Sequence, residues 1–254
     1  MVFAMRRSVS PAAFLFSVCA MLMASGQASL HVRAQIAPPQ NQVGPQAVWK
    51  PSDQVIANIR AKCGADSANV GECFLREMRS AGASAEAVAF SKTLAAKGFG
   101  YLSAFRDTGR VGVAYVEYVF RANEMEGIFL VNGDPPLIDV DDAKYISQSE
   151  LRKNSDYAAL LQQYPQLSVW PAGRNNTKFP LVTSSTVGQQ FIVEYLLQNG
   201  CHACARLGTA VISFQFDQSG RFRETLVLSV HAIATAHQAS AAHKTKTDNP
   251  DSRW

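Results

Sequence analysis

The sequence has few of the features that mark an enzyme, a nucleic-acid-binding protein or a membrane protein. After residue 28 no apolar run approaches the roughly 20 residues of a membrane-spanning helix. The 24 Lys and Arg residues nearly balance the 20 Asp and Glu residues, so there is no polybasic stripe for nucleic acid or anionic lipid. No complete catalytic constellation occurs in the sequence. These absences predict no membrane span in the mature chain, no nucleic-acid partner, no cofactor, no metal and no catalytic residue, and they favour a non-enzymatic function.

The N-terminus has the pattern of an export signal. Arg6 and Arg7 form a positive start, and residues 12–24 form an apolar core that is short for a membrane span. Cleavage after Ala28 satisfies the preference for small residues at the cleavage site, and cleavage after Ala34 is the alternative. We therefore expect a periplasmic or secreted protein.

Cysteine is scarce, with five residues in the whole chain. The first, Cys19, is removed with the signal, which leaves Cys63, Cys73, Cys201 and Cys204. In an oxidising compartment an even number favours two disulfides, and proximity along the chain favours joining 63 to 73 and 201 to 204 among the three pairings that four cysteines allow. The first bridge would fasten two helices together, and the second would close a short loop.

Composition and hydrophobic periodicity divide the chain into five parts. They are a signal peptide over residues 1–28, a flexible linker over 29–48, a helical subdomain over 49–106, an antiparallel sheet domain with one or two helices over 107–235, and a disordered tail over 236–254. Apolar residues recur at helical spacing in the third part and alternate in the fourth. The fold class predicted is α+β, with an N-terminal helical hairpin region packed beside an antiparallel β-sheet meander.

The same periodicities predict the individual elements. Helices are expected over residues 51–63, 71–80 and 84–95, with a further helical pattern between 141 and 164. Strands are expected over residues 111–120, 128–131, 137–140, 190–199, 210–216 and 226–230. A loop rich in turn-forming residues is expected over 170–176.

The short segment Cys201-His202-Ala203-Cys204 lies between two expected strands. Its side chains could support more kinds of chemistry than those of any other segment of the sequence. A thioredoxin-type redox centre needs its first cysteine at the start of a helix, whereas the residues after Cys204 allow one helical turn at most before β alternation resumes. A zinc site would need a second pair of ligands at a useful spacing, which is missing. A disulfide that shapes a loop is the favoured interpretation, and redox activity and metal binding stay open as alternatives.

This order of elements resembles a known family. A strand, a cysteine-bracketed loop with a histidine, a strand, an Asp-x-x-Gly turn and a last strand are similar to the C-terminal part of the periplasmic inhibitors of vertebrate lysozyme. In that family a disulfide-held loop presents a histidine to the lysozyme cleft. The resemblance implies that Cys201 and Cys204 form the clip and that His202 is the inserted side chain. The loop here is shorter than the family's and lacks its proline and its His-Asp pair.

A second candidate for partner binding is the loop that contains Trp170 and Arg174. Tryptophan and arginine are enriched at the energetic centres of protein interfaces, although a half-buried tryptophan that closes the sheet edge is the simpler interpretation. The predicted partner-binding residues are Cys201, His202, Ala203, Cys204, Trp170 and Arg174. The predicted partner is a protein, either a lysozyme-like hydrolase or another envelope component.

Two groups of acidic residues have weaker patterns. Asp139, Asp141 and Asp142 offer the oxygen ligands that calcium prefers, but they lack the glycine and glutamate of a calcium loop. Glu117 and Glu194 lie in expected strands and would suit acid-base chemistry if the fold brought them together. Solvent exposure is the simpler interpretation of both groups.

The sequence thus predicts an exported, non-enzymatic binding protein, in its most specific form similar to lysozyme inhibitors. A thiol-disulfide oxidoreductase that uses Cys201 as its nucleophile is the alternative from another functional class. An envelope scaffold protein is the third possibility.

Overall fold

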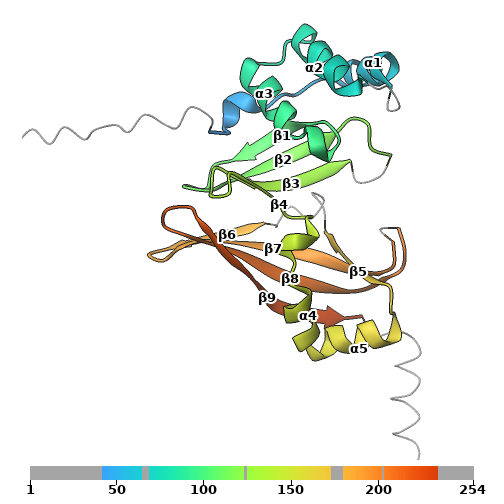
Figure 1. Ribbon diagram of the computed structural model, residues 1–254, viewed down its shortest axis with the longest axis vertical. Helices are drawn as coiled ribbons and strands as arrows, with labels where there is room; N and C mark the ends of the chain where they lie inside the picture. The colour runs from blue at the N-terminus through green and yellow to red at the C-terminus, as the bar shows by residue number, and fades with distance from the viewer. Residues whose placement is uncertain (1–41, 65–68, 123–124, 173–179, 202, 234–254) are drawn as a thin grey trace, which may run out of the picture. The chain divides into compact units, whose positions relative to one another are not determined.

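A computed structural model gives the structure of the chain, and it describes residues 42–64, 69–122, 125–172, 180–201 and 203–233. The expected signal peptide, most of the expected linker and all of the expected tail lie outside these residues. The described residues have the predicted α+β fold, with helices that precede antiparallel sheets (Figure 1). None of the described helices has the length and apolar character to cross a membrane.

The strands form two antiparallel sheets, so the predicted meander is divided. The first sheet contains, in spatial order, β1 (Gly100–Arg106), β2 (Gly112–Tyr118), β3 (Glu126–Val131) and β4 (Leu137–Asp139). The second sheet contains β5 (Leu167–Pro171), β6 (Leu181–Ser185), β7 (Gly188–Asn199), β8 (Arg206–Asp217) and β9 (Phe222–Ala232). Strands β7, β8 and β9 are consecutive neighbours, and both β5 and β6 pair with β7 along its other edge.

Three helices precede the first sheet, as predicted. They are α1 (Asp53–Cys63), α2 (Val70–Ser80) and α3 (Ala85–Thr93), followed by the single turn η2 (Ala95–Lys97). Serine hydroxyls cap two of them, because Ser52 Oγ accepts a hydrogen bond from the Val55 amide and Ser84 Oγ accepts one from the Ala87 amide. The disulfide between Cys63 and Cys73 joins the end of α1 to α2, with an S–S distance of 2.03 Å. The predicted helical hairpin is therefore fastened as expected.

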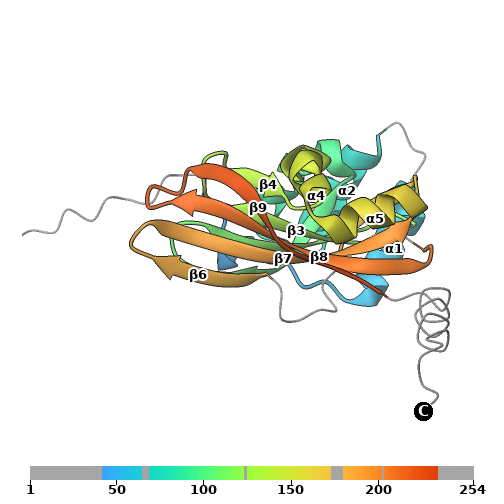
Figure 2. The same cartoon turned by 90° about the horizontal axis from the view of Figure 1, so that it is seen from below.

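Two further helices, α4 (Gln148–Lys153) and α5 (Ser155–Gln163), lie between the sheets in sequence, after the single turn η3 (Ala143–Tyr145). Asn154 separates them: its extended backbone ends α4, while its side-chain oxygen accepts hydrogen bonds from the amides of Asp156 and Tyr157 and begins α5. Helix α5 packs against β9 (Figure 2). Its buried face contains Tyr157 and Leu160, at the spacing that predicted the helix.

The first sheet is buried on both faces. One face packs against the second sheet and includes Val113, Leu130 and Ile138. The other face includes Val116 and Phe129 and packs against α3 and the short helix η1 (Pro45–Ala47). Burial on both faces explains why its strands are more continuously apolar than those of a sheet with one solvated face.

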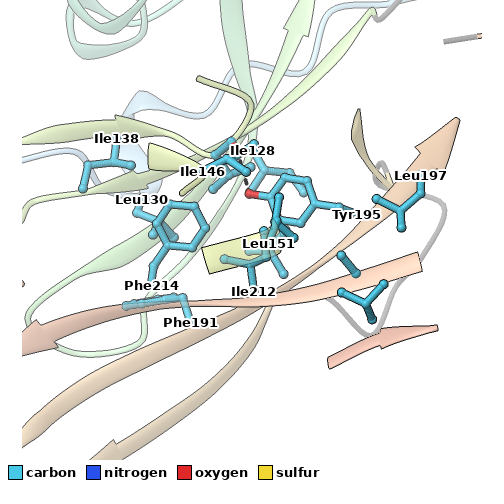
Figure 3. Packing of buried hydrophobic residues seen from close by; sticks show 14 of the residues in the cluster. Ile128, Leu130, Ile138, Ile146, Leu151, Phe191, Tyr195, Leu197, Ile212 and Phe214 are labelled. Carbon is cyan, nitrogen blue, oxygen red and sulfur yellow. Dashed lines mark hydrogen bonds between the residues drawn. The ribbon is translucent and has the colours of Figure 1, made fainter. Parts of the chain in front are cut away.

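The largest core cluster joins the two sheets and α4 and α5 (Figure 3). The inner face of the second sheet contributes alternate residues of β7 and β8, which are Phe191, Val193, Tyr195, Leu197, Ala210, Ile212, Phe214 and Phe216. Burial of each large apolar side chain contributes roughly 1.5 to 3 kcal/mol. The Tyr195 hydroxyl, fully buried, donates a hydrogen bond to the Val140 carbonyl at 2.7 Å. This bond connects β7 to the segment that follows β4.

Four parts of the fold were not predicted, and each has a physical reason. All five residues of β5 are half-buried, so this strand shows no alternation. Strand β1 lies within the expected helical subdomain, and its first four residues are all buried, so it shows no alternation. Strand β6 is exposed at four of its five positions, so it shows no alternation of buried and exposed residues. Residues 42–48 of the expected linker are held in place, because the Val43 amide donates to Asn132 Oδ1 and Asn132 Nδ2 donates to the Val43 carbonyl, both at 2.8 Å.

Candidate functional site at the Cys201–Cys204 hairpin

The two longest strands among the described residues, β7 and β8, have 12 residues each and are joined by the cysteine loop. Their register runs from Gly188 opposite Asp217 to Gln198 opposite Arg206, with a bulge at Leu197 and Gln198. The loop is therefore the tip of a long hairpin, as its position between two alternating segments predicted.

The loop is closed by a disulfide and by two backbone hydrogen bonds. Cys201 and Cys204 are bonded, with their Cα atoms 5.0 Å apart. The Cys204 amide donates to the Cys201 carbonyl at 3.0 Å, and the Asn199 amide donates to the Ala205 carbonyl at 3.1 Å. Both predicted disulfides are thus formed. These cross-links limit the conformations of the turn, and the paired strands below it fix its position.

The hairpin tip is at the surface. Cys201, Ala203, Ala205 and Arg206 are exposed, and Cys204 is half-buried. His202 lies outside the described residues. Strand β8 begins at Arg206, so the chain after the second cysteine continues as a strand, and Cys201 does not occupy the helix N-terminus that activates a thioredoxin-type thiol.

Other exposed groups lie at the same end of the second sheet. The Ile233 amide donates to the Leu207 carbonyl at 2.8 Å, which places Ile233 beside the start of β8, and its side chain is 46 % exposed. Gly200 has a left-handed backbone (φ +85°) next to the exposed Gln166. The tip, Ile233 and Gln166 thus form a mixed apolar and polar surface, with the positive charge of Arg206 at its side.

Trp170 is not in a loop, so that part of the prediction was wrong. It lies in β5 opposite Leu196 of β7, and Pro171 ends the same strand. Proline is tolerated there because β5 is an edge strand, whose outward amides have no ladder partner. Arg174 lies outside the described residues.

Trp170 is connected to the hairpin indirectly. Its indole Nε1 donates to Ser168 Oγ at 2.8 Å, and Ser168 Oγ donates to the Gln198 carbonyl at 3.1 Å. Gln198 Nε2 in turn points to the Cys204 carbonyl at 3.5 Å. The position of Trp170 along β7 is nevertheless five residues, or about 17 Å of strand, from Cys201. The structure therefore does not bring Trp170 into one contact surface with the loop.

Two of the three aspartates considered for calcium, Asp139 and Asp142, form salt bridges with lysines. Lys97 Nζ lies 3.1 Å from Asp139 and 3.4 Å from Asp142, and Lys144 Nζ lies 3.1 Å from Asp142. Asp139 Oδ1 also accepts a hydrogen bond from the amide of Asp141. These contacts give the carboxylates a role in holding the chain after β4. Among the residues that the structure describes, no group of three His, Cys, Asp or Glu side chains is placed to hold a metal.

Glu117 and Glu194 are not brought together, because they lie in β2 of the first sheet and β7 of the second. Glu117 is instead directly opposite Glu126 of β3 and opposite Tyr101 of β1. Sequence reasoning missed Glu126 and Tyr101. Strand β1 was not predicted, and the second expected strand began at Ile128, after Glu126.

No family model, curated protein or solved structure matches this chain. Its function is therefore proposed from the geometry of the hairpin and from the order of elements around it.

Proposed function

We propose that this protein is an exported, non-enzymatic binding protein that presents the Cys201–Cys204 hairpin to a protein partner. The observation that carries the proposal is an exposed, disulfide-closed turn at the tip of the two longest strands. The inner faces of these strands are anchored in the main core. A recognition loop on such a support loses little conformational entropy when it binds, which raises affinity.

The export signal in the sequence and the two disulfides support a location outside the cytoplasm. Disulfides form and persist in oxidising compartments. Both bridges here are formed between cysteines close in sequence, with separations of 10 and 3 residues.

The specific version of the proposal is inhibition of a lysozyme-like hydrolase, with His202 as the residue inserted into the partner. It is supported by the order of β7, the cysteine loop, β8, the turn after Asp217, and β9, which is the order of elements that suggested the resemblance to periplasmic lysozyme inhibitors. In the turn, Asp217 Oδ1 accepts hydrogen bonds from the amides of Ser219 and Arg221, and Gly220 has a left-handed backbone.

The test compares His202→Ala with His231→Ala, a control at an exposed histidine of β9. The purified mature protein is assayed against a panel of lysozymes, by inhibition and by surface plasmon resonance. We expect wild-type protein and the control to bind at least one lysozyme, and His202→Ala to bind it at least about tenfold more weakly. Circular dichroism should show both variants folded.

Absence of inhibition and binding across the panel at micromolar protein would exclude the lysozyme version. The general proposal is tested by affinity capture from an envelope extract with wild-type protein and a Cys201→Ser, Cys204→Ser double variant. A partner that both proteins capture equally well would exclude the hairpin as the binding surface.

A further inference from the structure

A cleft of about 620 Å³ lies between α1 and the first sheet, and it shares no lining residue with the hairpin. Its size is in the range of small-molecule sites, which span roughly 300 to 1,000 Å³. Its lining combines buried aromatic side chains with charged groups of both signs. The residues that matter here are Trp49, Ile56, Arg60, Tyr101, Glu117 and Glu126.

The aromatic part of the cleft is rigid. Trp49 and Tyr101 are both buried and meet edge to face, with ring centroids 5.2 Å apart. The Trp49 amide donates to the carbonyl of Leu102 in β1 at 2.9 Å, which fixes the segment before α1 along the sheet edge. The half-buried Ile56 of α1 adds an aliphatic side chain to the lining. A ligand thus meets a preformed apolar surface.

The sheet side of the cleft carries two carboxylates in one row. Tyr101, Glu117 and Glu126 occupy directly opposite positions across β1, β2 and β3. The Tyr101 hydroxyl donates to Glu117 Oε2 at 2.5 Å, which orients that carboxylate. Like charges directly opposite on neighbouring strands destabilise a sheet, and within the described part of the chain no hydrogen bond or salt bridge compensates Glu126. A cation between the two would remove this repulsion.

The helix side of the cleft carries a positioned arginine. Arg60 Nε donates to the Val119 carbonyl at 2.8 Å, and Arg60 Nη2 contacts Met125 Sδ at 3.7 Å. No carboxylate of the described residues lies within salt-bridge distance of Arg60. The carbonyl of Val119, just after β2, therefore sets the orientation of the guanidinium. Its remaining N–H groups can donate hydrogen bonds to a ligand.

The geometry points to a binding site for an amino acid or a short peptide that carries both a protonated amine and a carboxylate. The amine binds between Glu117 and Glu126, the carboxylate binds Arg60, and an apolar side chain packs against Trp49 and Ile56. The site is separate from the proposed protein-binding hairpin.

Ligands of other charge fit the cleft less well. An organic cation without a carboxylate would leave Arg60 without a counter-charge, and an anion would face Glu117 and Glu126. A neutral sugar would stack on the aromatic rings but would compensate neither sign of charge. The combination of both signs with an apolar surface therefore favours the zwitterion.

The probe for the test is the dipeptide leucyl-leucine, added to the mature protein in an NMR titration that follows the indole N–H signal of Trp49. The N-acetylated dipeptide lacks the positive charge, and the C-terminal amide lacks the negative charge. We expect the dipeptide to shift the Trp49 signal in a saturable manner, and each blocked derivative to bind at least about tenfold more weakly. Glucose and 1,5-diaminopentane should not produce saturable shifts.

Two variants assign the charges, and two matched variants control for them. Glu126→Gln should weaken binding of the dipeptide at least about fivefold without weakening binding of the N-acetylated dipeptide. Arg60→Gln should weaken binding of the dipeptide by as much without weakening binding of the C-terminal amide. Glu224→Gln and Arg79→Gln, at exposed positions outside the cleft, should bind like wild type. All four are checked for unchanged thermal unfolding.

The proposal is overturned by any of three results. The first is no shift of Trp49 up to about 10 mM dipeptide. The second is equal binding of the dipeptide and its blocked forms. The third is saturable binding of glucose or the diamine in preference to the dipeptide. None of these results bears on the hairpin, whose test uses His202.

Discussion

The side chain of Gln189 pairs with both backbone groups of Val111. Gln189 Oε1 accepts from the Val111 amide at 2.8 Å, and Gln189 Nε2 donates to the Val111 carbonyl at 3.2 Å and to the Thr108 carbonyl at 2.6 Å. Gln189 lies in β7, and Val111 precedes β2. One buried amide thus takes the place of a strand neighbour and joins the two sheets.

Replacement of this amide should be costly. Gln189→Leu leaves the buried polar groups of Val111 without a partner, so we expect the free energy of unfolding to fall by roughly 2 to 3 kcal/mol. Urea unfolding monitored by circular dichroism measures the change. Gln215→Leu, at a half-buried position of β8, is the control and should change stability by less than about 1 kcal/mol. An equal effect of both variants would contradict this role of Gln189.

A second buried contact, between β7 and the segment that follows β4, is the bond from Tyr195 to the Val140 carbonyl. Tyr195→Phe keeps the packing and removes only the hydroxyl, so the unfolding free energy should fall by about 1 to 2 kcal/mol. Chemical denaturation quantifies it. Tyr164→Phe, at the half-buried end of α5, should be close to neutral. If Tyr195→Phe is as stable as wild type, the bond does not contribute to stability.

The turn after Asp217 should make stability depend on pH. Hydrogen bonds from the Ser219 hydroxyl and from the backbone of Arg221 lower the pKa of Asp217 from 3.8 to about 2. Because the folded pKa lies below the unfolded one, the stabilisation is complete above about pH 4 and is lost as the pH falls through about 2. The difference in stability between wild type and Asp217→Asn should therefore shrink between pH 5 and pH 2, as measured by urea unfolding.

The exposed strand carboxylate Glu224 provides the control for that experiment. Glu224→Gln removes one negative charge without touching the turn, so it separates the effect of Asp217 from a general effect of net charge. A difference between wild type and Asp217→Asn that stays constant over the whole range would contradict the assignment.

The two disulfides should differ in their effect on stability. On the chain-entropy relation, the loop closed by Cys63 and Cys73 is worth roughly 3 kcal/mol, and the shorter loop closed by Cys201 and Cys204 is worth less. We therefore expect the double Ser variant of the first pair to lower the unfolding temperature more than that of the second. A larger fall in unfolding temperature for the Cys201 and Cys204 variant would contradict this expectation. It would show that the hairpin disulfide stabilises the protein by more than the closure of its short loop accounts for.

The state of the hairpin cysteines distinguishes presentation of a loop from redox catalysis. As a structural clip, the Cys201–Cys204 bridge should stay oxidised in mild glutathione buffers, as mass spectrometry after thiol alkylation would show. The bridge of Cys63 and Cys73 serves as the internal reference. Rapid reduction of the hairpin bridge alone would favour the oxidoreductase alternative.

Local patterns were sufficient where one side of an element faces water. The capped helices α1 and α3, the long alternation of β7 and β8, and the turn after Asp217 were all predictable, because each combines a short-range signal with a regular apolar period. The disulfides followed from proximity in sequence. These features include the whole hairpin, so this candidate site could be predicted from the sequence alone.

The remainder depends on contacts between residues distant in sequence. Strand β1 is buried on consecutive residues and β6 is exposed on nearly all of its residues, so neither shows the alternation of a half-buried strand. The opposition of Glu117 to Glu126 depends on the register of β2 with β3, and the approach of Arg60 depends on how α1 meets the sheet. Neither is encoded by a local pattern, so the cleft was not predicted.

The placement of β5 and β6 along one edge of β7 has a consequence for self-association. A long uncovered strand edge invites pairing with another molecule. Here that edge of β7 is occupied by two short strands of 5 residues each, of which β5 ends at Pro171. The β7 edge therefore offers no long run of free backbone groups to a second molecule, which protects this side of the sheet against edge-to-edge pairing.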